Sequence, residues 1–298
     1  MKHLLSLESL SGSDMAEILA LTQTLKATRG HHTEHPLRHQ CWGMIFSKSS
    51  TRTRVSFEVG IRELGGDVLF LSANDIQLGR GEPIKDTARV MGRMLHGAVI
   101  RTFAQSDVED FARYSNIPTI NALTDDEHPC QILADLFTIQ EKLGTYEGKT
   151  ITFIGDGMSN VARSWIWASS KLNFTLRIAS PKPFQPSPEL IARAGGDILV
   201  TDDLAAAASG ADVLYTDVWV SMGTEKQTEY RLAQLAGFQI NSTLLEKAAP
   251  GALAMHCLPA YRGKEITDEV MESHADTIFT EAENRLHVQK AIITWLLK

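Results

Sequence analysis

The alternation of short apolar runs with longer amphipathic segments is the feature of this 298-residue chain that most constrains its fold. Runs with the composition of buried strands occur at 41–46, 67–71, 98–101, 117–120, 150–154, 175–179, 197–200, 212–216, 252–256 and 276–279. Amphipathic patterns typical of helices lie between most of them, for example at 53–64, 85–95, 131–143 and 160–171. Strands that alternate with helices are typical of parallel sheets covered on both faces. We therefore predict an α/β protein with doubly wound parallel sheets.

The length of the chain predicts two domains, because one ordinary core rarely exceeds roughly 200 residues. Residues 144–149 are rich in Gly and polar side chains, follow a long helical pattern and precede a strong apolar run. We place the boundary there and expect domains at 1–146 and 147–298. The apolar terminal helix at 282–298 could pack back on the first domain.

Composition narrows the class of protein. Hydrophobic residues make up 43% and charged residues 22%, which is the balance of a folded globular chain. The net charge of −7 argues against nucleic acid as a partner. Three widely spaced cysteines are no disulfide framework and fit a reducing compartment. With no secretory signal and no run of about 18 apolar residues, we expect a cytoplasmic protein without a membrane partner.

A basic, hydroxyl-rich segment follows the apolar run that ends at Phe46. It contains Ser50, Thr51, Arg52 and Thr53, and a helical pattern begins at the same place. The free N–H groups at a helix start favour anions, and arginine adds donors that match phosphate oxygens. A solvated, well-capped basic turn is the alternative. We expect an anion site, since ligands of α/β sheets bind beyond the carboxyl ends of strands.

Two further sets of polar residues follow apolar runs in the first half. Arg101 ends the run 98–101, where it could meet a ligand or form a surface salt bridge. His128 and Gln131 lie at the start of the helical pattern 131–143, where both can donate hydrogen bonds to a carbonyl oxygen. The alternative for this pair is an ordinary capped turn.

The segment 151–160 (ITFIGDGMSN) combines an apolar run, a Gly turn and a helix start. This combination raises the alternative of an NAD-binding oxidoreductase. Asn160 stands where the third glycine of the dinucleotide fingerprint belongs, and the next apolar run ends without an acidic residue to bind a ribose. The dinucleotide interpretation is therefore disfavoured.

Polar residues follow two more apolar runs of the second half. Asp217, at the end of 212–216, could bind an ammonium group or cap a turn. Cys257 follows 252–256, and a lone cysteine is more often an inert apolar residue than a catalyst. A zinc site from His128, Cys130, His256 and Cys257 would have unusual ligand spacing. A thiol protease is also disfavoured, because no protease motif surrounds Cys257. The segment 31–39 is His-rich, but its spacing fits no closed metal site, and we expect a solvated loop.

Six motifs, in order and over nearly the whole chain, resemble those of the aspartate and ornithine carbamoyltransferase family. They are Ser50-Thr51-Arg52-Thr53-Arg54, residues 76–89, His128-Pro129-Cys130-Gln131, Asp217-Val218-Trp219-Val220-Ser221-Met222-Gly223, His256-Cys257-Leu258-Pro259 and Glu283-Asn284-Arg285. The resemblance implies carbamoyl phosphate ligands, which are Ser50, Thr51, Arg52, Thr53, Gln77, Arg101, His128, Gln131, Cys257, Leu258 and Arg285. It implies acceptor ligands at Asn160, Asp217, Ser221 and Met222.

The resemblance also implies an activity. The acceptor loop Ser221-Met222-Gly223 is similar to that of the ornithine enzymes, so we expect transfer of the carbamoyl group of carbamoyl phosphate to the side-chain amine of L-ornithine. Catalytic roles fall to Arg101, His128, Asp217 and Cys257, without metal or cofactor. Acceptors such as N-acetylornithine or putrescine, and a carbamoyl-phosphate-binding protein without activity, are the alternatives. Gln77 reaches a neighbouring subunit in relatives, which implies a homotrimer with shared active sites.

Overall fold

The structure is a computed structural model that describes residues 1–72, 81–221, 223 and 225–298. The chain divides into two compact units, which are Met1–Phe137 with Glu283–Lys298, and Thr138–Ala282. The boundary expected between residues 146 and 147 stays a prediction. Gln77 and Met222, both expected as ligands, lie outside the described residues.

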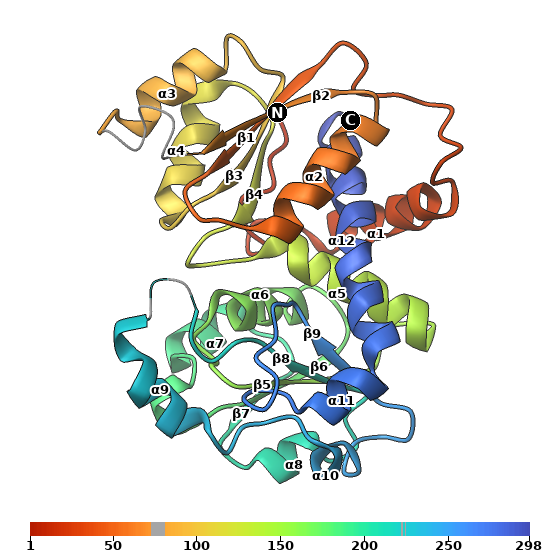
Figure 1. The fold of residues 1–298 in the computed structure, drawn as a ribbon, viewed down its shortest axis with the longest axis vertical. Helices are drawn as coiled ribbons and strands as arrows, with labels where there is room; N and C mark the ends of the chain where they lie inside the picture. Colours follow the sequence, from red (N-terminus) through yellow and green to blue (C-terminus); the bar gives the residue numbers. More distant parts are fainter. Residues whose placement is uncertain (73–80, 222, 224) are drawn as a thin grey trace. The chain divides into compact units, whose positions relative to one another are not determined.

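The first unit contains a parallel sheet in the order β2-β1-β3-β4, and Figure 1 shows helices on both of its faces. Its strands are β1 (Cys41–Phe46), β2 (Asp67–Ser72), β3 (Gly97–Arg101) and β4 (Thr119–Leu123). Its helices are α1 (Gly12–Ala27), α2 (Thr51–Glu63), α3 (Ile84–Met91), α4 (Gln105–Ser115), most of α5 (Pro129–Leu143) and the later part of α12 (Ala275–Leu296).

One face of this sheet packs on α3 and α4. Ile45 and Ile100 of the strands form an apolar cluster with Ala88 of α3 and Phe111 of α4. Helix α2 lies on the other face with α12, and it buries Phe57 and Ile61 (Figure 1). Strands β1 and β3 are buried almost throughout, as expected for strands covered on both sides.

The second unit contains a parallel sheet in the order β7-β6-β5-β8-β9. Its strands are β5 (Thr150–Ile154), β6 (Thr175–Ala179), β7 (Ile198–Thr201), β8 (Val213–Thr216) and β9 (Leu253–His256). Its helices are α6 (Asn160–Ser169), α7 (Pro188–Ala194), α8 (Leu204–Ala208), α9 (Thr228–Leu235), α10 (Ser242–Leu245), α11 (Asp268–Ser273) and two short 3-10 helices, η2 (Lys182–Phe184) and η3 (Glu225–Gln227).

Each face of the second sheet has its own apolar layer. Ile154 and Leu214 pack with residues of α8, α10 and α11 on one face. On the other face Trp165 of α6 meets Tyr215 and Phe174 edge-on, at centroid distances of 5.4 and 5.9 Å. The prediction of two doubly wound parallel-sheet domains is confirmed. Among the described residues, no helix is long and apolar enough to cross a membrane.

Two local expectations differ from the structure. The run 276–279 is not a strand but belongs to α12, which starts at Ala275. A short apolar run cannot be assigned to strand or helix by periodicity alone, and here it continues into a long helical pattern. The His-rich loop 31–39 is largely exposed, but the side chain of His32 is only 8% exposed.

Candidate active site

The functional residues predicted in the first unit lie at the carboxyl ends of three neighbouring strands. The loop from Ser50 follows β1, Arg101 ends β3, and His128 follows β4. Phe46 is the register partner of Arg101, and Arg101 is the partner of Leu123. Because these strands are parallel, the three segments emerge at one edge of the sheet, where ligands of such sheets bind.

The hydroxyl-rich segment forms the start of α2. Ser50 is the N-cap residue and its side chain accepts a hydrogen bond from the Thr53 N–H at 3.3 Å. Thr53 is fully buried, and its Oγ1 accepts a hydrogen bond from Arg285 Nη2 of α12 at 2.6 Å. Two segments far apart in the sequence thus bring a guanidinium to a helix start that already favours an anion. This is the geometry expected of a phosphate site.

Arg101, His128 and Arg285 form a buried, electropositive group. Their exposed fractions are 6%, 5% and 3%. Burial, and the positive charges of Arg285 and Arg101, lower the pKa of His128 well below its usual value. At neutral pH His128 is therefore a neutral imidazole, which can donate a hydrogen bond without adding a third charge.

Gln131 and Lys48 complete this edge of the sheet. Gln131 is fully buried in the first turn of α5, and its Nε2 donates to Asp135 Oδ1 at 2.8 Å, so its orientation is fixed. Lys48, which was not among the predicted ligands, is 6% exposed and forms an ion pair with Asp125. Its Nζ also lies 4.3 Å from the centre of the Phe103 ring. Lys48 belongs to the basic segment of the sequence, but no feature of the sequence indicated that its side chain is buried.

In the second unit, the turn 155–160 leads from β5 into α6. Ser159 is the N-cap of α6 and accepts from the Ala162 N–H at 3.2 Å, and Asn160 is the first helical residue. A β-carbon at Gly157 would lie 2.9 Å from both Ile178 Cγ2 and Pro186 Cδ. The glycine of this turn is therefore required by close packing within the protein itself.

Asp217 and Cys257 meet at the carboxyl ends of the neighbouring strands β8 and β9. Thr216 and His256, the last residues of these strands, are register partners. The Cys257 thiol donates to Asp217 Oδ1 at 3.0 Å, and the same oxygen accepts from the Val218 N–H at 2.7 Å. Burial raises the pKa of Asp217, although the two hydrogen bonds oppose that shift. Ser221, in the following loop, is exposed.

His256 and Glu265 form a hydrogen-bonded pair beside Cys257; the sequence suggested His256 only as an alternative zinc ligand and as part of a motif, and it did not single out Glu265. Both side chains are fully buried, with His256 Nε2 and Glu265 Oε1 3.1 Å apart. The Leu258 N–H donates to His256 Nδ1 at 2.9 Å, so the proton of the neutral ring is on Nε2 and faces the carboxylate. Leu258 has a φ of 56°, in the left-handed region. The only signal for this pair in the sequence was the run His-Cys-Leu-Pro with a Glu at position 265.

Arg231 of α9 links the two loops of the second unit that contain predicted acceptor ligands. Its Nε donates to the Trp219 carbonyl at 2.6 Å, and its Nη2 forms an ion pair with Asp156. Asp156 Oδ1 in turn accepts from the Met158 N–H at 2.9 Å and shapes the turn before Asn160. Arg231 is 6% exposed and lies 4.8 Å from the Phe184 ring. A single arginine within a helix gave no sequence signal.

The contacts of His256 and Cys130 disfavour a metal site. Among the described residues, Asp217, His256 and Cys257 have ligand atoms within 4.8 Å of one another. Both ring nitrogens of His256 already face protein partners, so it is not available as a ligand. Cys130 of the four-residue zinc alternative is fully buried, and burial raises its thiol pKa to about 12, which disfavours the thiolate a metal needs.

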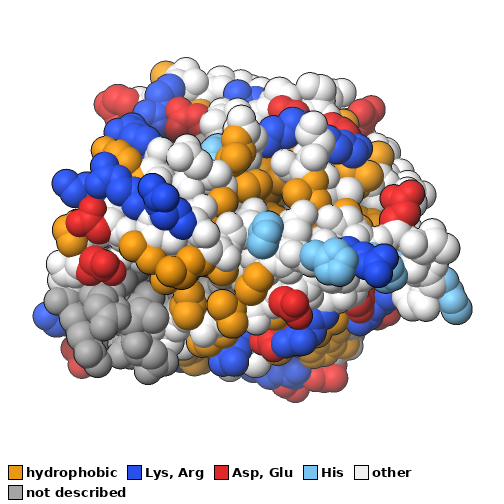
Figure 2. All heavy atoms as spheres, turned by 90° about the horizontal axis from the view of Figure 1, so that it is seen from above, with side chains coloured by type: hydrophobic (Ala, Val, Ile, Leu, Met, Phe, Trp, Pro, Cys, Tyr) orange, Lys and Arg blue, Asp and Glu red, His pale blue; other side chains and the backbone are white. Residues whose placement is uncertain are grey.

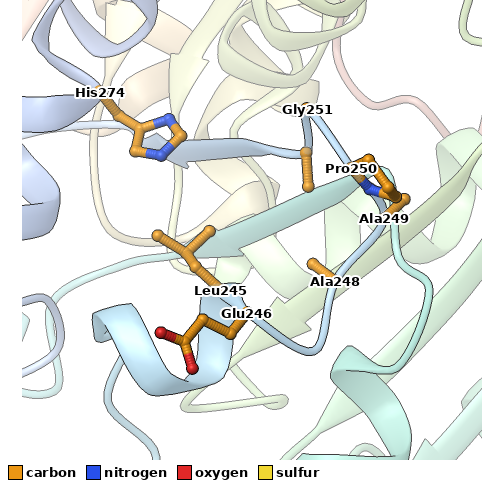
Figure 3. A pocket seen from close by; sticks show the side chains of 8 residues that line it. Leu245, Glu246, Ala248, Ala249, Pro250, Gly251 and His274 are labelled. Carbon is orange, nitrogen blue, oxygen red and sulfur yellow. The ribbon is translucent and has the colours of Figure 1, made fainter.

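A pocket of the second unit lies away from these residues. It is lined by Leu245, Glu246, Ala248–Ala252 and His274, before the start of β9 (Figure 3). Cys257 follows the other end of that strand, roughly 13 Å away at about 3.3 Å per residue. The pocket therefore does not belong to the predicted acceptor site.

Comparison with known proteins adds evidence over the whole chain. The carbamoyl-phosphate-binding domain of aspartate/ornithine carbamoyltransferases matches residues 2–141, and their Asp/Orn-binding domain matches residues 147–296. The chain belongs to the aspartate/ornithine carbamoyltransferase family.

Individual members of the family are close to this chain. An ornithine carbamoyltransferase of Akkermansia muciniphila is 56% identical over 99% of this chain and 98% of its own length. One of Synechococcus elongatus is 50% identical over 99% and 97%. The crystal structure of an anabolic ornithine carbamoyltransferase from Campylobacter jejuni superimposes with a TM-score of 0.93 at 42% identity, covering 99% of each chain. That of Pyrococcus furiosus gives 0.91 at 42%, covering 98% and 96%.

Membership in this carbamoyltransferase family confirms the resemblance inferred from the six motifs. The two family domains also agree with the way the predicted site residues are divided between the two halves of the chain. The phosphate-like site at Ser50–Thr53 lies within the carbamoyl-phosphate-binding match, and Asp217 and Cys257 lie within the Asp/Orn-binding match. The dinucleotide alternative for the 155–160 turn finds no support in these matches.

Proposed function

We propose that this protein transfers the carbamoyl group of carbamoyl phosphate to the side-chain amine of L-ornithine, giving L-citrulline and phosphate. The observation that carries the proposal is the Asp217–Cys257 pair, whose sulfur–oxygen distance is 3.0 Å, in the unit that matches the Asp/Orn-binding domain. A carboxylate beside a thiol can bind an ammonium group and accept its proton. The relatives' names point to the same acceptor.

The first unit supplies the proposed phosphate site. Ser50, Thr51, Arg52 and Thr53 at the start of α2, with Arg285, hold the phosphate and neutralise it as a leaving group. Arg101, His128 and Gln131 are assigned to the carbonyl oxygen, where negative charge grows in the tetrahedral transition state. Their burial strengthens these interactions, because the effective dielectric constant is low away from water.

The charge of the second unit's site favours ornithine over aspartate as acceptor. Asp217 would repel the side-chain carboxylate of aspartate and attract the side-chain ammonium of ornithine. Asn160 and Ser221, with Met222 outside the described residues, are assigned to ornithine. Putrescine has no α-carboxylate for the Asn160 side chain, and N-acetylornithine has no α-ammonium group, so both would forgo part of these contacts.

The attacking amine must lose a proton. A free alkyl ammonium has a pKa of about 10, so the site has to assist its deprotonation at neutral pH. Asp217 is the proposed acceptor of that proton, since burial raises its pKa and makes it a stronger base than an exposed carboxylate. Cys257 orients Asp217 through its thiol. The family resemblance also assigns Cys257 and Leu258 to carbamoyl phosphate. These roles need no covalent intermediate and use only side chains of the protein.

Citrulline formation tests the proposal directly. The purified protein is given carbamoyl phosphate with L-ornithine, N-acetylornithine, putrescine or L-aspartate, and each carbamoylated product is measured. We expect turnover with ornithine to exceed turnover with the other three by at least 100-fold, which corresponds to about 2.7 kcal/mol of transition-state discrimination. Preference for another acceptor would contradict the assignment of Asp217, and no turnover with any would contradict the activity.

We further propose a cytoplasmic homotrimer with shared active sites that serves arginine biosynthesis. Support for the trimer comes from the motif that contains Gln77, and from exposed apolar side chains on the first unit. Leu69 on the edge strand β2 and Val55 on α2 are 51% and 55% exposed, and Figure 2 shows apolar side chains gathered on one face. Light scattering of the purified protein tests the trimer, for which a monomeric mass of 32.9 kDa would be the contrary result.

A further inference from the structure

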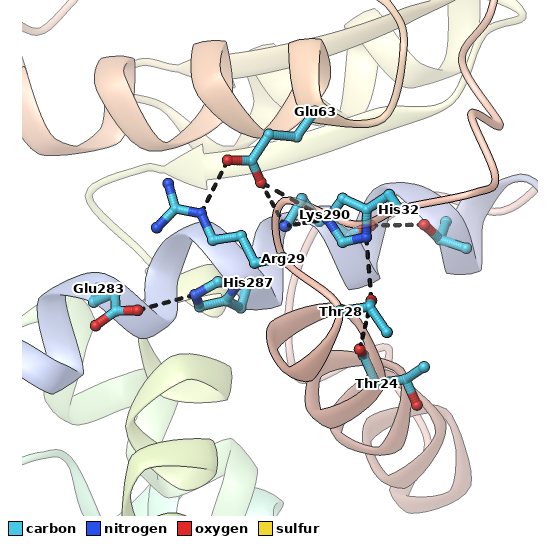
Figure 4. Close-up of polar contacts among 9 residues, drawn as sticks. Thr24, Thr28, Arg29, His32, Glu63, Glu283, His287 and Lys290 are labelled. Carbon is cyan, nitrogen blue, oxygen red and sulfur yellow. Dashed lines mark hydrogen bonds and ion pairs between the residues drawn. The ribbon is translucent and has the colours of Figure 1, made fainter.

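A buried charged cluster in the first unit has no role in the proposed reaction. The Lys290 side chain on α12 is fully buried, and its Nζ lies 2.6 Å from Glu63 Oε2 at the end of α2. Glu63 Oε1 accepts from Arg29 Nε at 3.0 Å, so both carboxylate oxygens are engaged. Figure 4 shows Glu63 and Lys290 pointing toward each other from the two helices, with Arg29 and His32 beside them.

His32, from the His-rich loop, completes the cluster. Its Nε2 lies 3.1 Å from Lys290 Nζ, and its Nδ1 lies 3.2 Å from Thr28 Oγ1. An ammonium can only donate, so Nε2 accepts and the ring proton is on Nδ1, directed at Thr28. The Thr28 hydroxyl then donates to the Thr24 carbonyl of α1 at 2.8 Å. Each partner of Lys290 is therefore oriented by a further hydrogen bond, and the cluster fixes one position of the ammonium.

The cluster lies at one end of a helix pair whose other end forms the phosphate site. Helices α2 and α12 meet at Thr53 with Arg285, then at Gly60 with Leu286 and Lys290, and finally at Glu63 with Lys290. The residue numbers rise together, so the two helices run in the same direction. Thr53 and Glu63 are separated by about 15 Å of helix, at 1.5 Å per residue.

Close packing joins the two ends of this helix pair. A β-carbon at Gly60 would lie 3.2 Å from Lys290 Cγ and 3.5 Å from Leu286 Cδ1, so the glycine lets α2 approach α12. Apolar contacts of this kind resist separation of the helices but are not directional. Two directional contacts between the described parts of α2 and α12 are the Arg285–Thr53 hydrogen bond and the Lys290–Glu63 ion pair.

We infer that Lys290, held by Glu63 and His32, is a positioning residue that sets the register of α12 against α2 and so places the Arg285 guanidinium at the phosphate site. The inference rests on the proposed binding of carbamoyl phosphate by this site. A displacement of about 1 Å in a positioned group can lower a rate by on the order of 100-fold. Lys290 acts on binding through Arg285, and none of the described contacts brings Lys290 itself to the phosphate loop.

Steady-state kinetics of Lys290→Met separate positioning from general destabilisation. We expect the KM for carbamoyl phosphate to rise about tenfold and kcat to fall, because Arg285 also neutralises the leaving group, with the KM for ornithine within twofold of wild type. Lys290→Arg should recover part of the affinity, because it keeps a donor for Glu63. The matched control is Lys298→Met, which removes the 2.7 Å ion pair of Lys298 with Glu17 of α1 and leaves the α2 contact intact. It should not change either KM.

The double variant Lys290→Met with Glu63→Leu gives the decisive comparison. Replacing a buried ion pair by apolar residues often leaves stability near wild type, so its melting temperature should recover relative to Lys290→Met. We expect the raised KM for carbamoyl phosphate to persist. Recovery of KM together with stability would overturn the inference, as would a KM within twofold of wild type in both variants.

Direct binding keeps this test independent of the proposed reaction. Isothermal titration with inorganic phosphate measures the same site without acceptor or turnover. If the wild type binds phosphate and Lys290→Met binds it about tenfold more weakly, the positioning role is supported even if ornithine is not the acceptor. Equal binding by wild type and Lys290→Met contradicts the positioning role, whereas citrulline formation by the wild type reports on the proposed function alone.

Discussion

The substitution Asp217→Asn tests the chemistry assigned to the second unit. Asparagine has nearly the same shape, and its Oδ1 can still accept from the Val218 N–H, which lies 2.7 Å from the Asp217 oxygen. The change therefore removes a charge and a base while keeping the local fold. General base catalysis typically contributes 10²- to 10⁴-fold, so we expect kcat to fall by that factor, or about 2.7–5.4 kcal/mol. The KM for ornithine should also rise, because the ammonium loses its counter-charge.

The pH dependence of the same variant sharpens this prediction. Burial raises the pKa of Asp217 above its usual 3.8, so the wild-type kcat/KM should fall on the acid side of neutrality as this carboxylate is protonated. The acid limb should be absent from Asp217→Asn. Asp212→Asn is the control, since Asp212 accepts from the Thr150 N–H at 2.9 Å at the opposite end of β8. A kcat within threefold of wild type, with the acid limb retained, would refute the base role.

Three further predictions concern other residues of the second unit. Arg231→Met should raise the KM for ornithine about tenfold and leave that for carbamoyl phosphate unchanged, because the Trp219 carbonyl and Asp156 lose their shared donor; unchanged ornithine kinetics would contradict it. Cys257→Ser should lower turnover with the melting temperature within a few degrees of wild type, and wild-type turnover would remove Cys257 from the mechanism. Burial lowers the pKa of His274, whose Nδ1 accepts from the Ala254 N–H at 3.3 Å. Below about pH 6.5 this histidine is protonated in the unfolded chain before it is protonated in the folded one. The free energy of unfolding should therefore fall by up to about 1.4 kcal/mol for each pH unit. His274→Asn, which cannot titrate, should reduce this slope in urea unfolding at pH 5.5–7, and an unchanged slope would show that His274 does not contribute.

The sequence predicted the fold class because the alternation of apolar runs and amphipathic segments reflects burial in parallel sheets. The strand prediction at 276–279 was wrong, because four residues fit the periodicity of a strand as well as that of a helix, and here they belong to the longer helix α12. The sequence also predicted which loops lie together, since polar residues after buried parallel strands share one edge of a sheet. Ser50 at the start of α2 and Asp217 after β8 are examples.

What the sequence could not provide is the set of contacts made across long separations. Thr53 and Arg285 are 232 residues apart, and their 2.6 Å hydrogen bond exists only because α12 packs on α2. The burial of His32 depends in the same way on Lys290, so a histidine in a polar loop looked solvated. Such contacts depend on tertiary packing, which periodicity does not encode. The roles of the individual site residues stay predictions until the variants are measured.

The surroundings of Cys257 combine two features that are not expected to stabilise the fold. A fully buried histidine–carboxylate pair is seldom more stabilising than apolar residues of similar size, and a left-handed non-glycine residue costs about 1–3 kcal/mol. Both features occur within two residues of Cys257, at His256 and Leu258, and one hydrogen bond joins them. Because His256 Nδ1 fixes the Leu258 N–H while Glu265 fixes Nε2, the segment 256–258 can hold one conformation. In this conformation the Cys257 thiol donates to Asp217, a defined thiol–carboxylate geometry that an apolar core could not supply.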